Sequence, residues 1–236
     1  MMLRRVRRLL ACRLALYSDR ALALLECSTP LATLAYTAAT PSAVLVIFLP
    51  GIGDLAEDFE SRGFIEALMQ SPLRADAMAV DAHYGYYGRR TVLERLAQDV
   101  VLPARSRYRE VWLVGISMGG MGALSYVAQH PEHIARALLL APYLGEAEWT
   151  EEPAADAGDA RAHVRRVWRW IRDHQREQAL RPRLYLGYGS GDRFAAANAL
   201  FASHLPPGHV LTLTGGHDWR TWRRLWQSFL SMWTVR

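Results

Sequence analysis

The residues Gly-Ile-Ser-Met-Gly at positions 115–119 have the spacing of a serine nucleophile held in a tight turn. A buried-strand pattern at residues 111–114 ends at this turn, and a helical pattern follows it. In a strand-to-helix turn the serine hydroxyl is exposed, while the glycines leave room for the close approach of the backbone. The free N–H groups of a helix N-terminus also favour negative charge beside Ser117. We therefore predict that Ser117 is a nucleophile for acyl transfer.

A serine hydroxyl needs a base to remove its proton and an acid to orient that base. Asp192 follows the apolar run 184–187 through a short turn, and His217 follows the run 210–213 through a Gly-Gly turn. Both residues should lie at the carboxyl edge of a parallel sheet, beside Ser117, in the chain order serine, acid, histidine. We predict that His217 is the base and that Asp192 orients it.

Asp218 is an alternative acid because it follows His217 directly. Adjacent side chains do not face one another, however, and Asp218 stands just before a helical pattern where a carboxylate caps first-turn N–H groups. We therefore expect Asp218 to be a cap. The remaining histidines lack the combination of strand end, glycine turn and chain order.

Acyl transfer also requires N–H donors for the oxyanion of the tetrahedral intermediate. One predicted donor is the backbone N–H of Met118, the residue after the nucleophile. The second should come from the loop Leu-Pro-Gly-Ile-Gly-Asp at residues 49–54, where glycines allow the amides to turn inward. We favour Ile52 or Gly53 as that donor. The alternative for this loop is a plain strand-to-helix turn.

Aromatic residues near the predicted strand ends are candidates for substrate contacts. His83 and Tyr84 belong to the run Asp-Ala-His-Tyr-Gly-Tyr-Tyr-Gly that follows a predicted strand, and Tyr143 follows another. These rings are expected to line the site and to contact acyl or alcohol groups. Packing beneath a loop is an equally good interpretation of the same residues.

Apolar runs alternate with helical patterns along the chain, which predicts an α/β fold with a mostly parallel central sheet and helices on both faces. The expected strands are 31–35, 44–49, 78–80, 111–115, 137–140, 184–187 and 210–213. The expected helices are 58–70, 92–101, 119–130 and 219–233.

One long interval, between residues 141 and 183, breaks this alternation. It holds an acidic stretch of small residues at 151–159 and an amphipathic helical pattern at 163–174. Because long insertions are often lids, we expect a small helical cap at about residues 145–180, with Trp168 contacting substrate. The alternative is an ordinary crossover helix with a long loop.

Composition excludes several classes of protein. The 236 residues are 51% hydrophobic and 22% charged, with 17 glycines and 11 prolines, which excludes collagen-like, low-complexity and wholly disordered chains. No apolar stretch is long enough for an ordinary membrane-spanning helix. The two cysteines, Cys12 and Cys27, have no metal-ligand spacing and cannot form a disulfide-rich scaffold. We expect neither a metal nor a cofactor.

The basic charge is confined to the N-terminus. Residues 1–20 hold six arginines and one aspartate, a net +5 that equals the charge of the whole chain. Nucleic-acid binding is therefore not expected of the folded body, which is neutral. We divide the chain into a basic N-terminal segment, residues 1–30, and one domain, residues 31–236.

The N-terminal segment resembles a targeting sequence, but Arg13, Asp19 and Arg20 interrupt the apolar core that a secretory signal needs. We expect an uncleaved, cytoplasmic chain whose first helix lies on the domain or on an anionic membrane surface as a peripheral contact. An exported or lipid-anchored form is the alternative, because Leu-Leu-Ala-Cys at residues 9–12 looks like a lipoprotein cleavage box.

Residues 31–236 resemble the α/β-hydrolase superfamily in four motifs: the LPGIGD loop, GISMGG, GSGD and GGHDW. The C-terminal residues Gly191, Asp192, Arg193, Phe194, Asn198, Phe201, Leu205, 215–219 and Trp222 look like those of the esterase D and tributyrin esterase group. The resemblance implies hydrolysis of carboxylic esters through an acyl-serine intermediate, without a metal or cofactor. One departure is Pro50-Gly51, where such enzymes often have His-Gly.

The function expected from these observations is a serine hydrolase that cleaves a small- or medium-chain acyl ester, a small-molecule substrate. Two other functions use the same residues or fold. A thioesterase or acyltransferase would use the same triad, and a non-catalytic protein of this fold would bind a ligand without turning it over. The sequence does not indicate an oligomeric state.

Overall fold

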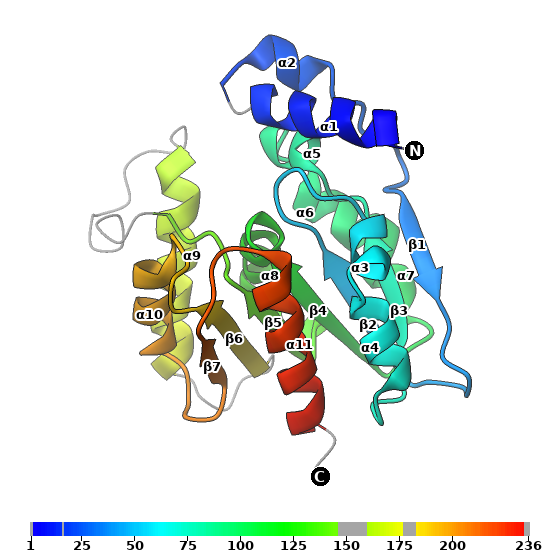
Figure 1. The fold of residues 1–236 in the computed structure, drawn as a ribbon, viewed down its shortest axis with the longest axis vertical. Helices are drawn as coiled ribbons and strands as arrows, with labels where there is room; N and C mark the ends of the chain where they lie inside the picture. Colours follow the sequence, from blue (N-terminus) through cyan, green and yellow to red (C-terminus); the bar gives the residue numbers. More distant parts are fainter. Residues whose placement is uncertain (1, 16, 146–159, 177–182, 234–236) are drawn as a thin grey trace.

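The computed structural model describes residues 2–15, 17–145, 160–176 and 183–233. Within them, a sheet has the strand order β1-β3-β2-β4-β5-β6-β7 (Figure 1). Neighbouring strands are parallel except for β1, which is antiparallel to β3. The strands are β1 (Thr33–Tyr36), β2 (Val44–Leu49), β3 (Asp76–Val80), β4 (Glu110–Ile116), β5 (Arg136–Leu140), β6 (Arg183–Gly189) and β7 (Val210–Leu213).

Each predicted strand is present in this sheet, which confirms the α/β class. The central strands are apolar, apart from the first residues of β4 and β5, Glu110 and Arg136, because helices cover both of their faces. Ile47 of β2, for example, lies between Met78 of β3 and Leu113 of β4 and is fully buried. The parallel strands all end at one edge, and this edge positions the candidate site.

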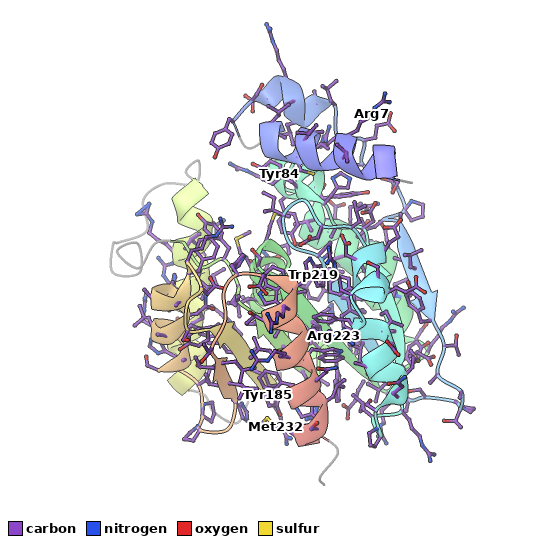
Figure 2. All side chains as sticks on the ribbon, viewed as in Figure 1. Arg7, Tyr84, Tyr185, Trp219, Arg223 and Met232 are labelled. Atoms are coloured by element: carbon purple, nitrogen blue, oxygen red, sulfur yellow. The ribbon has the colours of Figure 1, made fainter. Side chains whose placement is uncertain are left out.

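Helices α3 (Glu57–Ser61), α4 (Phe64–Gln70) and α11 (Trp219–Trp233) pack on one face of the sheet. Their contact is aromatic: the rings of Phe64 and Trp226 stack with centroids 6.0 Å apart, and Phe48 meets both rings edge-on. The indole N–H of Trp226 donates to the carbonyl of Phe64 at 3.0 Å. Trp219 lies at the start of α11 against Phe64 (Figure 2). This packing fixes the helix that directly follows His217.

The other face carries α6 (Val92–Arg95), α7 (Leu102–Arg105), α8 (Met118–Gln129), α9 (Ala160–Arg176) and α10 (Ala195–Ala202). A π-helical segment, Leu96–Val101, joins α6 to α7. Pro103 lies in the next turn and has no N–H to donate, so the regular ladder is interrupted there. The helix predicted at residues 58–70 is divided in two by Gly63, whose φ of 77° is left-handed. Helix α10 has no counterpart among the helices predicted from the sequence.

The helix of the predicted cap, α9, does not form a cap in the structure but packs in the core. Trp168 of α9 is only 1% exposed, and its indole N–H donates to the carbonyl of Leu144 at 2.9 Å. Val164, Val167 and Ile171 are buried in the same core, and α9 contacts α8. The amphipathic pattern therefore reflects a crossover helix between β5 and β6 rather than a lid, and Trp168 is a core residue. Residues 146–159 and 177–180 of the predicted cap lie outside the described residues.

The N-terminal segment forms two helices, α1 (Met2–Ala15) and α2 (Asp19–Ala23), which pack over α5 (Tyr84–Gly88) at one end of the molecule (Figure 1). Polar contacts hold this arrangement: Arg89 donates to the carbonyl of Leu22 at 3.1 Å and to Sγ of Cys27 at 3.1 Å. Among the described residues, no helix has the length and apolar character needed to cross a membrane.

Candidate active site

Ser117 stands between β4 and α8 in a strained conformation, with φ 52° and ψ −112°. A side chain at either flanking glycine would collide with backbone: a Cβ on Gly115 would lie 2.3 Å from the carbonyl oxygen of Gly119, and one on Gly119 would lie 2.2 Å from that of Leu49. The Gly-x-Ser-x-Gly pattern is thus required by the local packing. The turn holds Ser117 at the carboxyl edge of the sheet, as the sequence predicts.

His217 lies between Ser117 and Asp192. Its Nε2 is 2.9 Å from Oγ of Ser117, and its Nδ1 is 2.7 Å from Oδ2 of Asp192. With a neutral imidazole, Nδ1–H donates to the carboxylate and Nε2 accepts the serine O–H. The second carboxylate oxygen accepts the N–H of Phe194 at 2.8 Å. The structure therefore brings together the three residues that the sequence predicts for the triad, in hydrogen-bonded order.

Asp218 faces away from this series. Its Oδ1 accepts the N–H of Thr221 at 2.9 Å, and its carbonyl accepts the N–H of Trp222, as expected of the cap of α11. The backbone hydrogen bond from Thr221 is the main cause that lowers the pKa of Asp218 from 3.8. Asp218 is thus held as an ionised cap at neutral pH.

Two aromatic rings flank His217. The rings of Phe194 and Trp222 meet the imidazole edge-on from centroids 5.0 Å away, at interplanar angles of 87° and 90°. The Phe194 and Trp222 rings hold the imidazole of His217 in the plane in which both of its nitrogens are hydrogen-bonded. In the sequence, Phe194 and Trp222 stand out only as parts of a resemblance, and nothing in their spacing indicates contact with His217.

The loop after β2 lies directly against Ser117. A Cβ on Gly51 would be 3.5 Å from Cβ of Ser117. Ile52 and Gly53 form the turn of this loop, which closes through the N–H of Asp54 and the carbonyl of Gly51 at 3.2 Å, with Gly53 at a φ of 80°. Met118 begins α8, so its N–H has no acceptor within the helix. All three predicted oxyanion donors therefore lie on segments that adjoin Ser117.

Asp54 connects this loop to α11, a contact that the sequence analysis did not predict. Its Oδ1 accepts the indole N–H of Trp219 at 3.1 Å. Trp219 in turn packs edge-on against Phe59 and Phe64, so the loop is tied to a rigid aromatic cluster. No periodicity relates Asp54 to Trp219, which is 165 residues away.

Tyr143, a predicted substrate contact, lies beside the triad. Its N–H donates to the carbonyl of Ser117 at 3.0 Å, and its half-buried ring meets that of Phe194 at 5.3 Å. The amide of Asn198 donates to the carbonyls of Pro142 and Phe194, at 3.3 and 2.9 Å. These bonds hold the segments that carry the Tyr143 and Phe194 rings. Tyr143 and Phe194 form a partly exposed apolar surface next to His217.

The prediction that His83 and Tyr84 contact substrate is wrong in the structure, where both residues hold the N-terminal segment. His83 is buried; its Nδ1 accepts the N–H of Gly85, and its Nε2–H donates to the carbonyl of Glu26 at 3.0 Å. Tyr84 packs beneath α1 against the cluster formed by Cys12, Ala15 and Leu25 (Figure 2). Helix α5, which includes Tyr84, therefore supports α1 and α2 on the domain.

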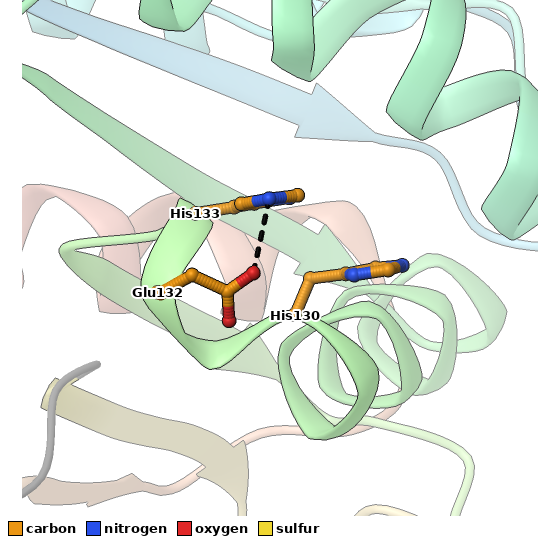
Figure 3. Close-up of side chains that lie close together, drawn as sticks. All are labelled: His130, Glu132 and His133. Atoms are coloured by element: carbon orange, nitrogen blue, oxygen red, sulfur yellow. Dashed lines mark ion pairs between the residues drawn. The ribbon is translucent and has the colours of Figure 1, made fainter.

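His130, Glu132 and His133 form a separate cluster (Figure 3). It lies at the opposite end of α8 from Ser117. Its donor atoms lie within 4.8 Å of one another. However, His133 Nε2 pairs with Glu132 at 3.0 Å, and its Nδ1 is 3.0 Å from the hydroxyl of Tyr126. The two imidazoles are stacked almost parallel, 4.9 Å apart, so their in-plane lone pairs do not converge on one point. This cluster is a partly buried, hydrogen-bonded group rather than part of the triad.

Comparison with known families gives a match to the model "Esterase", described as "Putative esterase", over residues 44–230. The match contains β2 through most of α11, and with them all three residues of the candidate triad. No curated protein sequence matches the chain.

Many solved structures share the fold. S-formylglutathione hydrolase from Staphylococcus aureus is 16% identical with a TM-score of 0.61, over 85% of this chain and 84% of that one. Est1E from Butyrivibrio proteoclasticus is 17% identical with a TM-score of 0.60, over 86% of this chain and 92% of that one. A monoacylglycerol lipase from Paleococcus ferrophilus is 13% identical with a TM-score of 0.61, over 86% of this chain and 98% of that one. These similarities confirm the α/β-hydrolase fold.

Proposed function

This chain belongs to the Esterase family and is a carboxylic ester hydrolase, and on that premise we propose that Ser117, His217 and Asp192 catalyse the hydrolysis through an acyl-serine intermediate. The observation that carries the proposal is the hydrogen-bonded series from Ser117 Oγ through His217 to Asp192, at 2.9 and 2.7 Å. That series joins a nucleophile, a base and an acid in the order that serine catalysis requires.

In the first half-reaction, Oγ of Ser117 attacks the ester carbonyl carbon while its proton passes to Nε2 of His217. Asp192 stabilises the imidazolium that forms and keeps Nδ1 protonated. The carbonyl oxygen becomes an oxyanion, which accepts hydrogen bonds from the N–H of Met118 and from that of Ile52 or Gly53. When the tetrahedral intermediate collapses, the C–O bond to the alcohol breaks and His217 returns its proton to the departing oxygen.

In the second half-reaction, water takes the place of the alcohol. His217 removes a proton from the water, whose oxygen attacks the acyl carbon, and the same N–H groups stabilise the second oxyanion. Collapse then releases the carboxylic acid and returns the proton to Ser117. Each step uses a proton site that is already hydrogen-bonded in the resting enzyme.

The substrate that we propose is an ester with a small- or medium-length acyl chain. Tyr143 and Phe194 support this proposal because their partly exposed rings lie beside His217, where acyl or alcohol groups would pack. Trp168, the other aromatic residue predicted to contact substrate from the cap, is buried in the core and does not belong to this surface.

The test is a series of p-nitrophenyl esters from acetate to palmitate, assayed with the wild-type protein and with Ser117→Ala. We expect kcat/KM to be highest for a short or medium chain and to fall for palmitate, with no turnover by the variant. A maximum at palmitate would refute the substrate class. Turnover of matched acyl thioesters far above that of the oxygen esters would instead assign the site to a thioesterase.

A further inference from the structure

Helix α1 has one face packed on the domain and another face exposed. Cys12 and Ala15 are buried in a cluster with Leu25. Three apolar residues at intervals of four, and hence on one face of the helix, are instead exposed by 46, 55 and 61%: Val6, Leu10 and Leu14. The burial of Cys12 and Ala15 turns this apolar row outward, while Arg89 and His83 hydrogen-bond the segment after α1 and hold it on the domain.

Exposed apolar side chains are concentrated on this N-terminal unit. Of the eight large ones that are exposed among the described residues, five lie between residues 6 and 24, including Tyr17 at 90% and Leu24 at 76%. A concentration of this kind on an otherwise polar surface marks a site of interaction with a partner or a membrane. We call the row of Val6, Leu10 and Leu14 on α1 the N-terminal apolar face.

The charge around the N-terminal apolar face determines which partner suits it. Residues 1–20 hold six arginines against one aspartate, while the rest of the chain is neutral. Arg7 and Arg20 are exposed, and Arg7 lies on α1 at the end of the molecule farthest from α11 (Figure 2). An exposed apolar row on an arginine-rich helix is the pattern of a helix that lies in the plane of an anionic lipid surface.

The helix that carries the N-terminal apolar face lies at the same edge of the sheet as the candidate site. Helix α5, which seats α1 and α2, follows the carboxyl end of β3, and Ser117 follows that of β4. Both strands are parallel to β2, so the two ends lie at one edge (Figure 1). Tyr87 of α5 also touches α8, since a Cβ on Gly122 would lie 2.3 Å from its hydroxyl. The helix beneath the N-terminal unit thus contacts the helix that begins at Ser117.

We propose that α1 and α2 dock the enzyme on an anionic lipid surface through the N-terminal apolar face and its arginines, with the ester site turned toward that surface. Leucine side chains enter the boundary between headgroups and acyl chains, and the arginines bind lipid phosphates. Esters that partition into the lipid then reach Ser117 without crossing bulk water.

The test is flotation of the 236-residue Ser117→Ala chain with vesicles of phosphatidylcholine alone and with vesicles of phosphatidylcholine and phosphatidylglycerol in equal parts. This variant separates docking from catalysis, so the failure of one proposal does not affect the other. We expect binding to the anionic vesicles only, weakened by salt. Leu10→Ser with Leu14→Ser should weaken it about tenfold or more, and Arg7→Gln about fivefold.

Leu200→Ser is the matched control, because Leu200 is an exposed leucine on α10 and lies outside the N-terminal apolar face. It should bind as tightly as the parent, and all variants should melt at the same temperature. The proposal is overturned if the parent Ser117→Ala protein does not bind anionic vesicles, or if the double leucine variant binds them as tightly as this parent. It is also overturned if light scattering shows a dimer that the double leucine variant dissociates, because the face would then be covered by a second copy of the chain.

Discussion

Nδ1 of His217 lies 2.7 Å from Oδ2 of Asp192, a residue 25 positions away, rather than contacting its neighbour Asp218. Asp192 reaches the imidazole because the turn after β6 lies beside the turn after β7 in the parallel sheet. Asp218 is committed to the first turn of α11 through the N–H of Thr221. The two carboxylates therefore have different predicted roles, which substitution separates.

Asp192→Asn should lower kcat/KM by about 10³–10⁴, since loss of the corresponding charge in a serine protease costs about 10⁴. Asp218→Asn should change kcat/KM little, because asparagine also caps helices well. Steady-state kinetics and melting temperatures of both variants provide the check. If both fold and Asp218→Asn is the inactive one, the acid has been misassigned.

The hydrogen bond between Asp54 and Trp219 is predicted to position the loop after β2, residues 49–54, which carries the proposed oxyanion donors Ile52 and Gly53. Trp219→Phe removes the indole N–H while keeping a ring against Phe59 and Phe64. Asp54→Ala removes the acceptor. Each should lower kcat about tenfold, less than the 10²–10³ lost when an oxyanion donor is deleted, with little change in KM.

The double variant Asp54→Ala with Trp219→Phe distinguishes positioning from general destabilisation. If the hydrogen bond is what both residues contribute, the double variant should be no slower than either single variant. Losses that multiply would show that the two residues act independently. Unchanged kcat in both single variants would show that the contact has no role in catalysis.

Trp168→Ala is predicted to affect stability and not selectivity. The side chain is buried and its indole N–H is paired with Leu144, so truncation should lower the free energy of unfolding by about 3–5 kcal/mol. Relative kcat/KM across the ester series should stay the same. Trp168→Phe, which keeps a ring, should lose less stability. A changed chain-length preference at unchanged stability would restore the cap interpretation.

Stability should depend on pH through His133. Burial, the largest cause, lowers the pKa of His133 from 6.5, and the nearby Glu132 opposes this shift. On acidification below 6.5 the unfolded chain binds a proton that the folded chain resists, so stability falls until the pH passes the lowered pKa. His133→Gln should flatten this dependence in chemical denaturation, and Glu132→Gln should extend it to lower pH. An unaltered pH profile in His133→Gln would contradict the assignment.

The sheet and the candidate triad could be predicted from sequence because their signals are local. A strand buried on both faces appears as an unbroken apolar run, as in β2 and β4. The turn at Ser117 needs its glycines for steric reasons, and the Gly-Gly turn before His217 is also close packed, since a Cβ on Gly215 would lie 2.3 Å from Oγ1 of Thr221. The chain order serine, acid, histidine then selects Asp192 and His217.

The features that were missed depend on contacts between distant segments. An amphipathic helix has the same pattern whether it covers a pocket or the sheet, so the periodicity of α9 could not separate a cap from a crossover helix. The aromatic run at 83–87 likewise contains no sign that the N-terminal helices would cover it. Phe194, Trp222 and Asp54 acquire their positions only when the strands are assembled.

The most direct test of the account is covalent labelling of the folded protein with a fluorophosphonate, followed by mass spectrometry of the labelled peptide. The hydrogen-bonded pair of Ser117 Oγ and His217 Nε2, 2.9 Å apart, predicts one phosphonyl group per chain, carried by Ser117. Ser117→Ala should fold with an unchanged melting temperature and take up no label, whereas Asp192→Asn should label far more slowly. A folded wild-type protein that stays unlabelled, or a label that persists in Ser117→Ala, would contradict the assignment of Ser117 as the nucleophile.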